Sequence, residues 1–220
     1  MTALPNRHPI GDEFLLDYAA GTAPEPIALV VASHVALNPQ SRETLSRLEA
    51  AGGALLNELP PASVAEASLE RVLARLETQE ATPLPTQPRN AEVRLPEALR
   101  AYLPEGIEAL PWRRRAGGLA EAELPCGDGQ RYKVSLLRIG AGKPIPRHGH
   151  SGEELLLVLQ GGFADEHGHY VRGDVCFADA AVEHRPLADA DGDCLCLAVT
   201  EGPIRLKGLP GFLLRPFLRR

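Results

Sequence analysis

One cluster of histidine, glutamate and glycine residues constrains this chain more than any other feature. It reads Gly142-x5-His148-x-His150-x3-Glu154-x6-Gly161 and is followed by Gly173-x10-His184. Residues two apart on a β-strand point to the same side, so His148 and His150 can bind one cation. The glycines mark turns between strands. The pattern predicts a metal site with four ligands: His148, His150, Glu154 and His184.

Three imidazoles and a carboxylate suit a divalent first-row metal ion. We expect one ion per chain, with zinc as the first choice and iron, manganese or nickel as alternatives. The competing interpretation is a set of scattered polar residues on a barrel surface. It is disfavoured because the four ligand types and three glycines fall in register together.

The second half of the chain has the pattern of an all-β domain. Short apolar runs such as ELLLVLQGGFAD and CLCLAVT are separated by turn residues, which is typical of a barrel or sandwich. Cys194 and Cys196 lie two apart on one such run, a spacing poorly suited to a mutual disulfide. We interpret them as reduced, buried strand residues, with a redox or metal role as the alternative.

The first 80 residues have helical periodicity instead. A first helix is expected near residues 12–20, and a second has an apolar face made by Ile27, Val30, Val31, His34 and Val35. Asn38-Pro39 is a good start for a third helix, which we expect to stop at Gly52-Gly53. A Ser63-x-x-Glu66 capping box predicts the start of a fourth.

A proline-rich stretch separates the two patterns. Residues 78–96 hold several prolines and few large apolar side chains, which marks a domain boundary. We therefore predict an α+β, two-domain fold: a small all-α domain over 1–80, a linker over 81–96 and an all-β barrel over 97–220. Four short helices make a small core, so we expect the first domain to be marginally stable alone.

Charge is distributed unevenly along the chain. Residues 1–80 hold 5 Lys and Arg against 11 Asp and Glu, whereas residues 81–220 hold 18 of each. An acidic module is poorly suited to direct nucleic-acid binding and better suited to a basic protein partner, although an acidic, solvated helix surface is an equally simple explanation. No apolar run is long enough to span a membrane and no signal peptide is evident, so we expect a cytoplasmic protein.

Residues 142–184 resemble both sequence motifs of the cupins, which implies a double-stranded β-helix, or jelly-roll, barrel. The first motif is complete. The second departs from the family pattern at Asp179, where cupins usually have Pro, and at Ala181, where they usually have Gly. His184 is retained, so the resemblance supports the same four metal ligands.

The segment HPIGDEFLLDYAAGTAPEPIALVVASHVALNPQSRETL is similar to the anti-sigma domain of ChrR-type anti-sigma factors. That resemblance spans nearly the whole chain. It implies that the helical domain sequesters an ECF-type sigma factor, that the cupin regulates its release in an oxidative stress response, such as one to singlet oxygen or peroxide, and that a homodimer through the cupin is compatible with the architecture.

The resemblance fails at one place. The zinc site in the helical domain of this family uses a histidine near the start and a His-x3-Cys-x2-Cys run, and the matching residues here are His8, His34, Asn38 and Ser41. Amide and hydroxyl oxygens replace thiolates poorly on zinc. We therefore expect this zinc site to be lost, with His34 at the edge of the helical core and His8 at the surface.

Two further functions are open. A cupin metalloenzyme, a dioxygenase or a peroxide-processing enzyme, would use an open metal position, but no additional acid, base or nucleophile has a readable spacing. A relic inhibitor would have lost its sigma factor together with its cysteines. His167 and His169 flank a probable hairpin turn in DEHGHY and are interpreted as turn residues.

Overall fold

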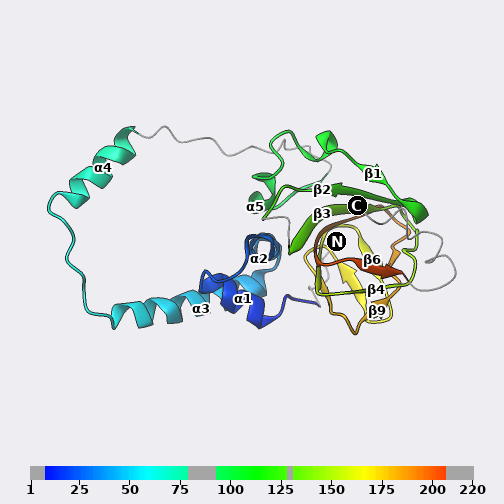
Figure 1. Ribbon diagram of the computed structural model, residues 1–220, viewed down its shortest axis with the longest axis horizontal. Coiled ribbons are helices and arrows are strands. Elements are labelled where there is room, and N and C mark those ends of the chain that lie inside the picture. Colours follow the sequence, from blue (N-terminus) through cyan, green and yellow to red (C-terminus); the bar gives the residue numbers. More distant parts are fainter. Residues whose placement is uncertain (1–7, 79–92, 128–130, 207–220) are drawn as a thin grey trace.

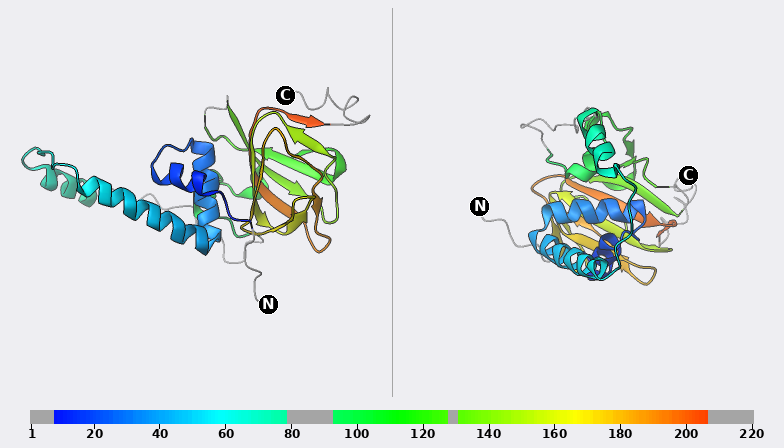
Figure 2. Two further views of the ribbon diagram at one scale, coloured as in Figure 1. Left: turned by 90° about the horizontal axis from the view of Figure 1, so that it is seen from below. Right: turned by 90° about the vertical axis from the view of Figure 1, so that its left-hand side faces the viewer.

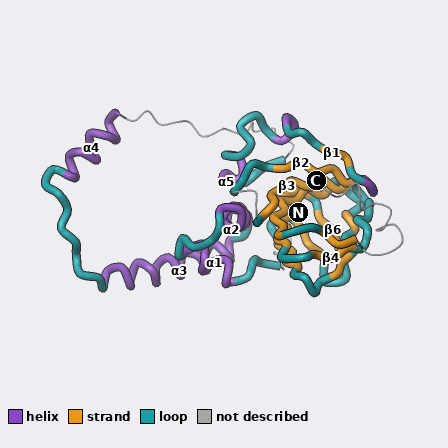
Figure 3. Tube along the Cα trace, viewed as in Figure 1, coloured by secondary structure: helices purple, strands orange, loops and turns teal. Residues whose placement is uncertain are grey.

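A computed structural model of the chain describes residues 8–78, 93–127 and 131–206, and in them helices precede strands (Figure 1). Figure 3 shows α1 to α4 on one side of the molecule and the strands on the other, with α5 beside the strands. The helices are α1 (Asp12–Ala19), α2 (Glu25–Leu37), α3 (Pro39–Asn57), α4 (Ser68–Thr78) and α5 (Glu97–Arg100), and 3-10 turns cover Ile107–Ala109 and Ala116–Gly118.

The strands form a barrel of three antiparallel sheets. The largest sheet has the order β1-β2-β3-β11-β5-β8, and two three-stranded sheets, β10-β6-β7 and β12-β4-β9, complete the barrel. The strands are β1 (Arg113–Arg114), β2 (Leu119–Glu123), β3 (Tyr132–Ile139), β4 (His148–His150), β5 (Glu154–Gln160), β6 (Gly162–Ala164), β7 (His169–Val171), β8 (Val175–Ala178), β9 (Glu183–His184), β10 (Leu187–Ala188), β11 (Cys194–Glu201) and β12 (Ile204–Leu206). The predicted combination of N-terminal helices and a jelly-roll barrel is confirmed.

The central strands of the large sheet are buried on both faces. In β5, Leu155, Leu157 and Leu159 belong to a core shared with the helices, whereas Leu156 and Val158 face the barrel interior. Strand β11 alternates in the same way. A continuous apolar run is what a strand needs when neither face meets water, which explains why ELLLVLQ and CLCLAV show little polar alternation.

Helix α2 covers the outer face of this sheet. Its residues Ile27, Leu29, Val30 and Val31 are buried in one cluster with residues of β3, β5 and β11. The helix also contacts α1, α3 and α5, so it is enclosed on several sides. A helix that is apolar nearly all round is stable only when it is buried in this way.

Helix α3 begins as the sequence predicts. The side-chain oxygen of Asn38 accepts a hydrogen bond from the backbone N–H of Ser41 at 3.0 Å, and Pro39 occupies the first turn. The predicted stop at Gly52-Gly53 is wrong, since the helix continues to Asn57. Two glycines cost roughly 1 kcal/mol each in a helix interior, and the flanking Ala and Leu residues favour helix strongly enough to continue it.

The far half of α3 and all of α4 form an arm that leaves the rest of the molecule (Figure 2). Helix α4 has no buried residue. It begins at Ser68 rather than at the predicted capping box, because Ser63 to Ala67 form no helical turn and Ala67 adopts a left-handed conformation with φ of 59°. We call residues 49–78 the arm.

The predicted linker at 81–96 lies mostly outside the described residues. Its described part, residues 93–96, contains Val93, which is buried in the core shared by helices and sheet, and Leu95, which packs against it. The predicted small core belonging to the helices alone is not what the structure shows, because α1 and α2 share their core with the barrel. None of the described helices combines the length and apolar character that a membrane span requires.

The shared core predicts that helices and barrel unfold together. Leu29→Ala should destabilise the protein by about 2–5 kcal/mol, the usual cost of deleting a buried leucine side chain. Urea unfolding followed by helical circular dichroism and by the fluorescence of Trp112 should shift equally in both signals. Leu56→Ala, on the exposed arm, is the control and should change little. A shift in the helical signal alone would show two independent folding units.

Candidate metal centre

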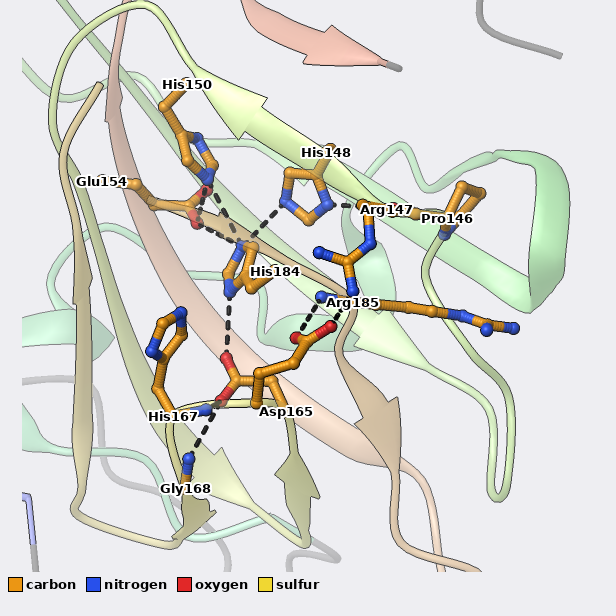
Figure 4. A network of polar contacts seen from close by, with 11 residues as sticks. Pro146, Arg147, His148, His150, Glu154, Asp165, His167, Gly168, His184 and Arg185 are labelled. Atoms are coloured by element: carbon orange, nitrogen blue, oxygen red, sulfur yellow. Dashed lines mark hydrogen bonds and ion pairs between the residues drawn. The ribbon is translucent and has the colours of Figure 1, made fainter. Parts of the chain in front are cut away.

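Three short strand segments bring the predicted ligands together inside the barrel (Figure 4). His148 and His150 lie two apart on β4, and His184 on β9 is paired directly across from His148. Glu154 begins β5, next to the turn that follows β4. The sheet register, rather than closeness in sequence, therefore places His184 against the other two histidines.

The four side chains converge on one point. Nε2 of His184 is 3.0 Å from Nε2 of His148 and 3.3 Å from Nε2 of His150, and Nε2 of His150 is 3.4 Å from a Glu154 oxygen. Ligands about 2.0–2.1 Å from a zinc ion are separated by about 2.9–3.4 Å when they subtend 90–109° at the metal. The spacing of the ligand atoms therefore fits a divalent ion at their centre.

Burial prepares these groups to bind a cation. All four side chains are buried. Burial, together with the neighbouring His184, lowers the pKa of His148 to about 4, and burial with the two neighbouring imidazoles lowers the pKa of His150 to about 4. Both rings are therefore neutral near pH 7 and keep a lone pair for a metal. Burial raises the pKa of Glu154 to about 7, a charge cost that a bound cation would offset.

Two of the histidines have an outer partner that fixes the ring. Nδ1 of His148 lies 3.0 Å from the carbonyl oxygen of Pro146, and Nδ1 of His184 lies 3.0 Å from a carboxylate oxygen of Asp165. Sequence reasoning missed Asp165. Its only signal is an acidic residue at the start of a turn, which by itself indicates no contact with a strand almost twenty residues away.

Three thiols lie in the barrel interior, and one of them, Cys176, lies close to His184. Cys176, Cys194 and Cys196 are buried, and the Sγ atoms of Cys194 and Cys196 are 3.6 Å apart on one face of β11. Cys194 and Cys196 are buried strand residues, as predicted, and all three thiols are free of disulfide bonds. A hydrogen bond with Cys194 and burial raise the pKa of Cys196 well above its usual range, so its thiol stays protonated.

The two turn histidines lie outside this group. His169 is half-exposed and its Nε2 is 3.0 Å from Asp189, while His167 is exposed and donates its backbone N–H to Asp165. Their interpretation as turn residues agrees with the hairpin between β6 and β7.

His34 in the helical half is buried, not at the edge of the core as predicted. Its Nδ1 is 2.9 Å from the carbonyl oxygen of Gly173, which can only accept, so Nδ1 carries the proton. Nε2 then accepts from the hydroxyl of Ser41 at 2.8 Å and from the N–H of Ile10 at 3.3 Å. Burial lowers the pKa of His34, which keeps the ring neutral. We call His34, Ser41 and Gly173 the clasp.

His8 is half-buried, so it lies at the surface as predicted, and it also contacts the barrel. Its ring lies 4.4 Å from the ring of Tyr170, its N–H donates to a carboxylate oxygen of Asp174, and its carbonyl accepts from the N–H of Val175 at 2.8 Å. The clasp and the residue 8 backbone thus hold the same barrel turn, Gly173 to Val175, from the helical side.

Known proteins resemble this chain in sequence and in fold. Residues 106–205 match the model of the ChrR cupin-like domain. The anti-sigma-E factor ChrR of Cereibacter sphaeroides is 41% identical over 97% of this chain and 98% of its own length. In the crystal structure of Rhodobacter sphaeroides SigE in complex with the anti-sigma ChrR, a chain that is 38% identical superposes with a TM-score of 0.74, covering 89% of this chain and 99% of that one. The chain therefore belongs to the family of ChrR-type anti-sigma factors.

Proposed function

We propose that this chain is an anti-sigma factor that sequesters an ECF-type sigma factor through its helices and releases it under control of the cupin. The observation that carries the proposal is likeness over nearly the whole chain to a protein that was crystallised with its sigma factor. Because both halves are matched, the likeness is more than a shared cupin fold.

The arm supplies the surface for such a partner. Its leucine and valine side chains are 49–82% exposed: Leu55, Leu56, Leu59, Val64, Leu69, Val72, Leu73 and Leu76. In α4 they recur at the spacing of one helix face, none of them is buried, and the arm extends away from the barrel (Figure 2). An apolar surface of this extent normally marks a protein interface.

Leu73→Asp should weaken the complex with the sigma factor at least about 30-fold, because an anchor residue at an interface contributes about 2 kcal/mol or more. The substitution leaves the fold intact, since Leu73 makes no buried contact. Leu187→Asp is the matched control, an equally exposed leucine on the barrel. Each ECF-type sigma factor of the host is co-expressed with the chain, and the affinity of the pair that co-purifies is measured by calorimetry. Equal affinities for the two variants would exclude the arm as the binding surface.

The same proposal assigns the metal to the barrel alone. His148, His150, Glu154 and His184 would hold one divalent ion, with zinc as the first choice. Two of the four positions of the family's helical zinc site, His34 and Ser41, belong to the hydrogen-bonded clasp instead. Both ring nitrogens of His34 already have hydrogen-bond partners. This supports the assignment of the metal to the barrel, because neither nitrogen is left over for a second metal ion.

Elemental analysis of the purified chain should find one metal ion per chain, and none in a His148→Ala/His184→Ala variant. A His167→Ala/His169→Ala variant removes two histidines outside the site and should keep the metal. Zinc at 100 times its dissociation constant should stabilise the wild type by about 2.7 kcal/mol. Metal retained by the first variant would place the site elsewhere, with His8 and His34 the first residues to re-examine.

The structure offers a short route from the metal to the helices. Glu154 points into the site, and the next residue, Leu155, packs in the core shared with α2. In strand β8, Ala178 pairs with Glu154. In the same strand, the N–H of Val175 donates a hydrogen bond to the backbone carbonyl of His8. A change at the metal can therefore bias the helices only if the two states of the barrel differ in these contacts.

We place the oxidant-sensitive step at the metal rather than at the thiols. Cys194 and Cys196 are wholly buried, and the raised pKa of Cys196 keeps its thiol in the protonated, unreactive form. Singlet oxygen from an illuminated photosensitiser should dissociate the wild-type complex. The His148→Ala/His184→Ala variant should bind the sigma factor but stay bound under the same light, as followed by size-exclusion chromatography. If Cys194→Ser/Cys196→Ser instead abolishes release while the histidine variant still responds, the thiols are the target.

A further inference from the structure

The outer partner of His184 is the least expected part of the site. Asp165 lies in the turn between β6 and β7, its side chain is 0% exposed, and its Oδ2 is 3.0 Å from Nδ1 of His184 (Figure 4). The other ring nitrogen of His184, Nε2, faces His148, His150 and Glu154. The imidazole therefore spans from the buried carboxylate to the centre of the site.

The turn fixes how the carboxylate is presented. Oδ1 of Asp165 accepts from the backbone N–H groups of His167 at 2.8 Å and Gly168 at 3.1 Å, and the backbone of Asp165 and Gly168 closes the turn. These two donors engage one oxygen and leave Oδ2 directed at His184. As a carboxylate, Asp165 can only accept there, so Nδ1 must carry the ring proton.

We propose that Asp165 is a positioning residue of the metal centre, which holds the ring proton of His184 on Nδ1 and so keeps the Nε2 lone pair free for the metal. The inference rests on the proposed metal site. A ligating histidine oriented in this way by a carboxylate is a more basic ligand, and loss of such a partner costs about 10–100-fold in metal affinity.

Asp165→Asn tests the idea with almost no change in shape. The two backbone N–H groups still require an oxygen, so the amide oxygen replaces Oδ1 and the NH2 group faces His184. That group donates to Nδ1 and moves the ring proton to Nε2, where it blocks the metal. The same kind of tautomer change explains the large loss of activity when the aspartate of a serine protease triad becomes asparagine.

The matched control is a second His–Asp pair in the same barrel. His169 and Asp189 are 3.0 Å apart, but they are partly exposed and outside the ligand group. Asp189→Asn makes the same chemical change without touching the site. Zinc affinity of the full-length chain, measured by competition with a chelating dye, should fall about 10–100-fold in Asp165→Asn and stay unchanged in Asp189→Asn.

Nuclear magnetic resonance of the imidazole nitrogens gives a readout that misfolding does not imitate. In the chelator-stripped chain, His184 should carry its proton on Nδ1 in the wild type and on Nε2 in Asp165→Asn. His184→Gln assigns the signal among the seven histidines. A proton on Nε2 in the wild type overturns the proposal even if the variant does not fold.

The outcomes separate this inference from the proposed function. A wild type that binds no zinc overturns the metal site and Asp165's role with it. A wild type that binds zinc, together with an Asp165→Asn chain that binds it equally well, overturns only the positioning role. A second zinc equivalent lost in Asp165→Asn would make Asp165 itself a ligand, with Cys176 and His184 as the companions that lie near it, and would also overturn the proposal.

Discussion

The central strands of the large sheet must bury both of their faces, and the rest of the structure depends on that constraint. One face of β5 and β11 lines the barrel interior with small and apolar side chains, where four ligand atoms gather at one end. The other face needs an apolar cover, which α2 supplies. Because a single strand serves both cores, the candidate metal site and the helices are separated by the thickness of one sheet.

The sequence was informative wherever a residue's role follows from its own element. His148 and His150 share a strand face, and Asn38 caps the helix that follows it, so short-range patterns were sufficient for both. Sequence reasoning failed where a residue's contact partner lies far away in the chain. The burial of His34 depends on Gly173, 139 positions away, and the role of Asp165 depends on a strand pairing that no local pattern encodes. The predicted helix stop at Gly52-Gly53 failed for a different reason. The cost of two glycines in a helix is smaller than the helix propensity of the residues around them.

If the helical half binds no zinc, as we propose, another interaction must stabilise it. A structural zinc ion contributes about 10–16 kcal/mol of binding free energy, whereas the three hydrogen bonds of the His34 ring contribute roughly 1.5–4.5 kcal/mol at about 0.5–1.5 each. The clasp alone cannot replace the metal. The difference must come from apolar burial, and the apolar surface available to α1 and α2 is the sheet. We therefore expect docking on the barrel to stabilise the helical half in place of a zinc ion.

The clasp connects the base of α3 to the barrel. Ser41 lies in the first turn of α3, where the helix is fixed to His34 and through it to the barrel turn at Gly173. The 19 residues of α3 extend about 28 Å from this point at 1.5 Å per residue. A rotation of roughly 5° at its base displaces the far end of such a rod by roughly 2.5 Å, enough to break side-chain packing against a bound partner. Because the arm extends away from the barrel (Figure 2), the proposed function requires a change in the cupin to reach the arm through the base of α3.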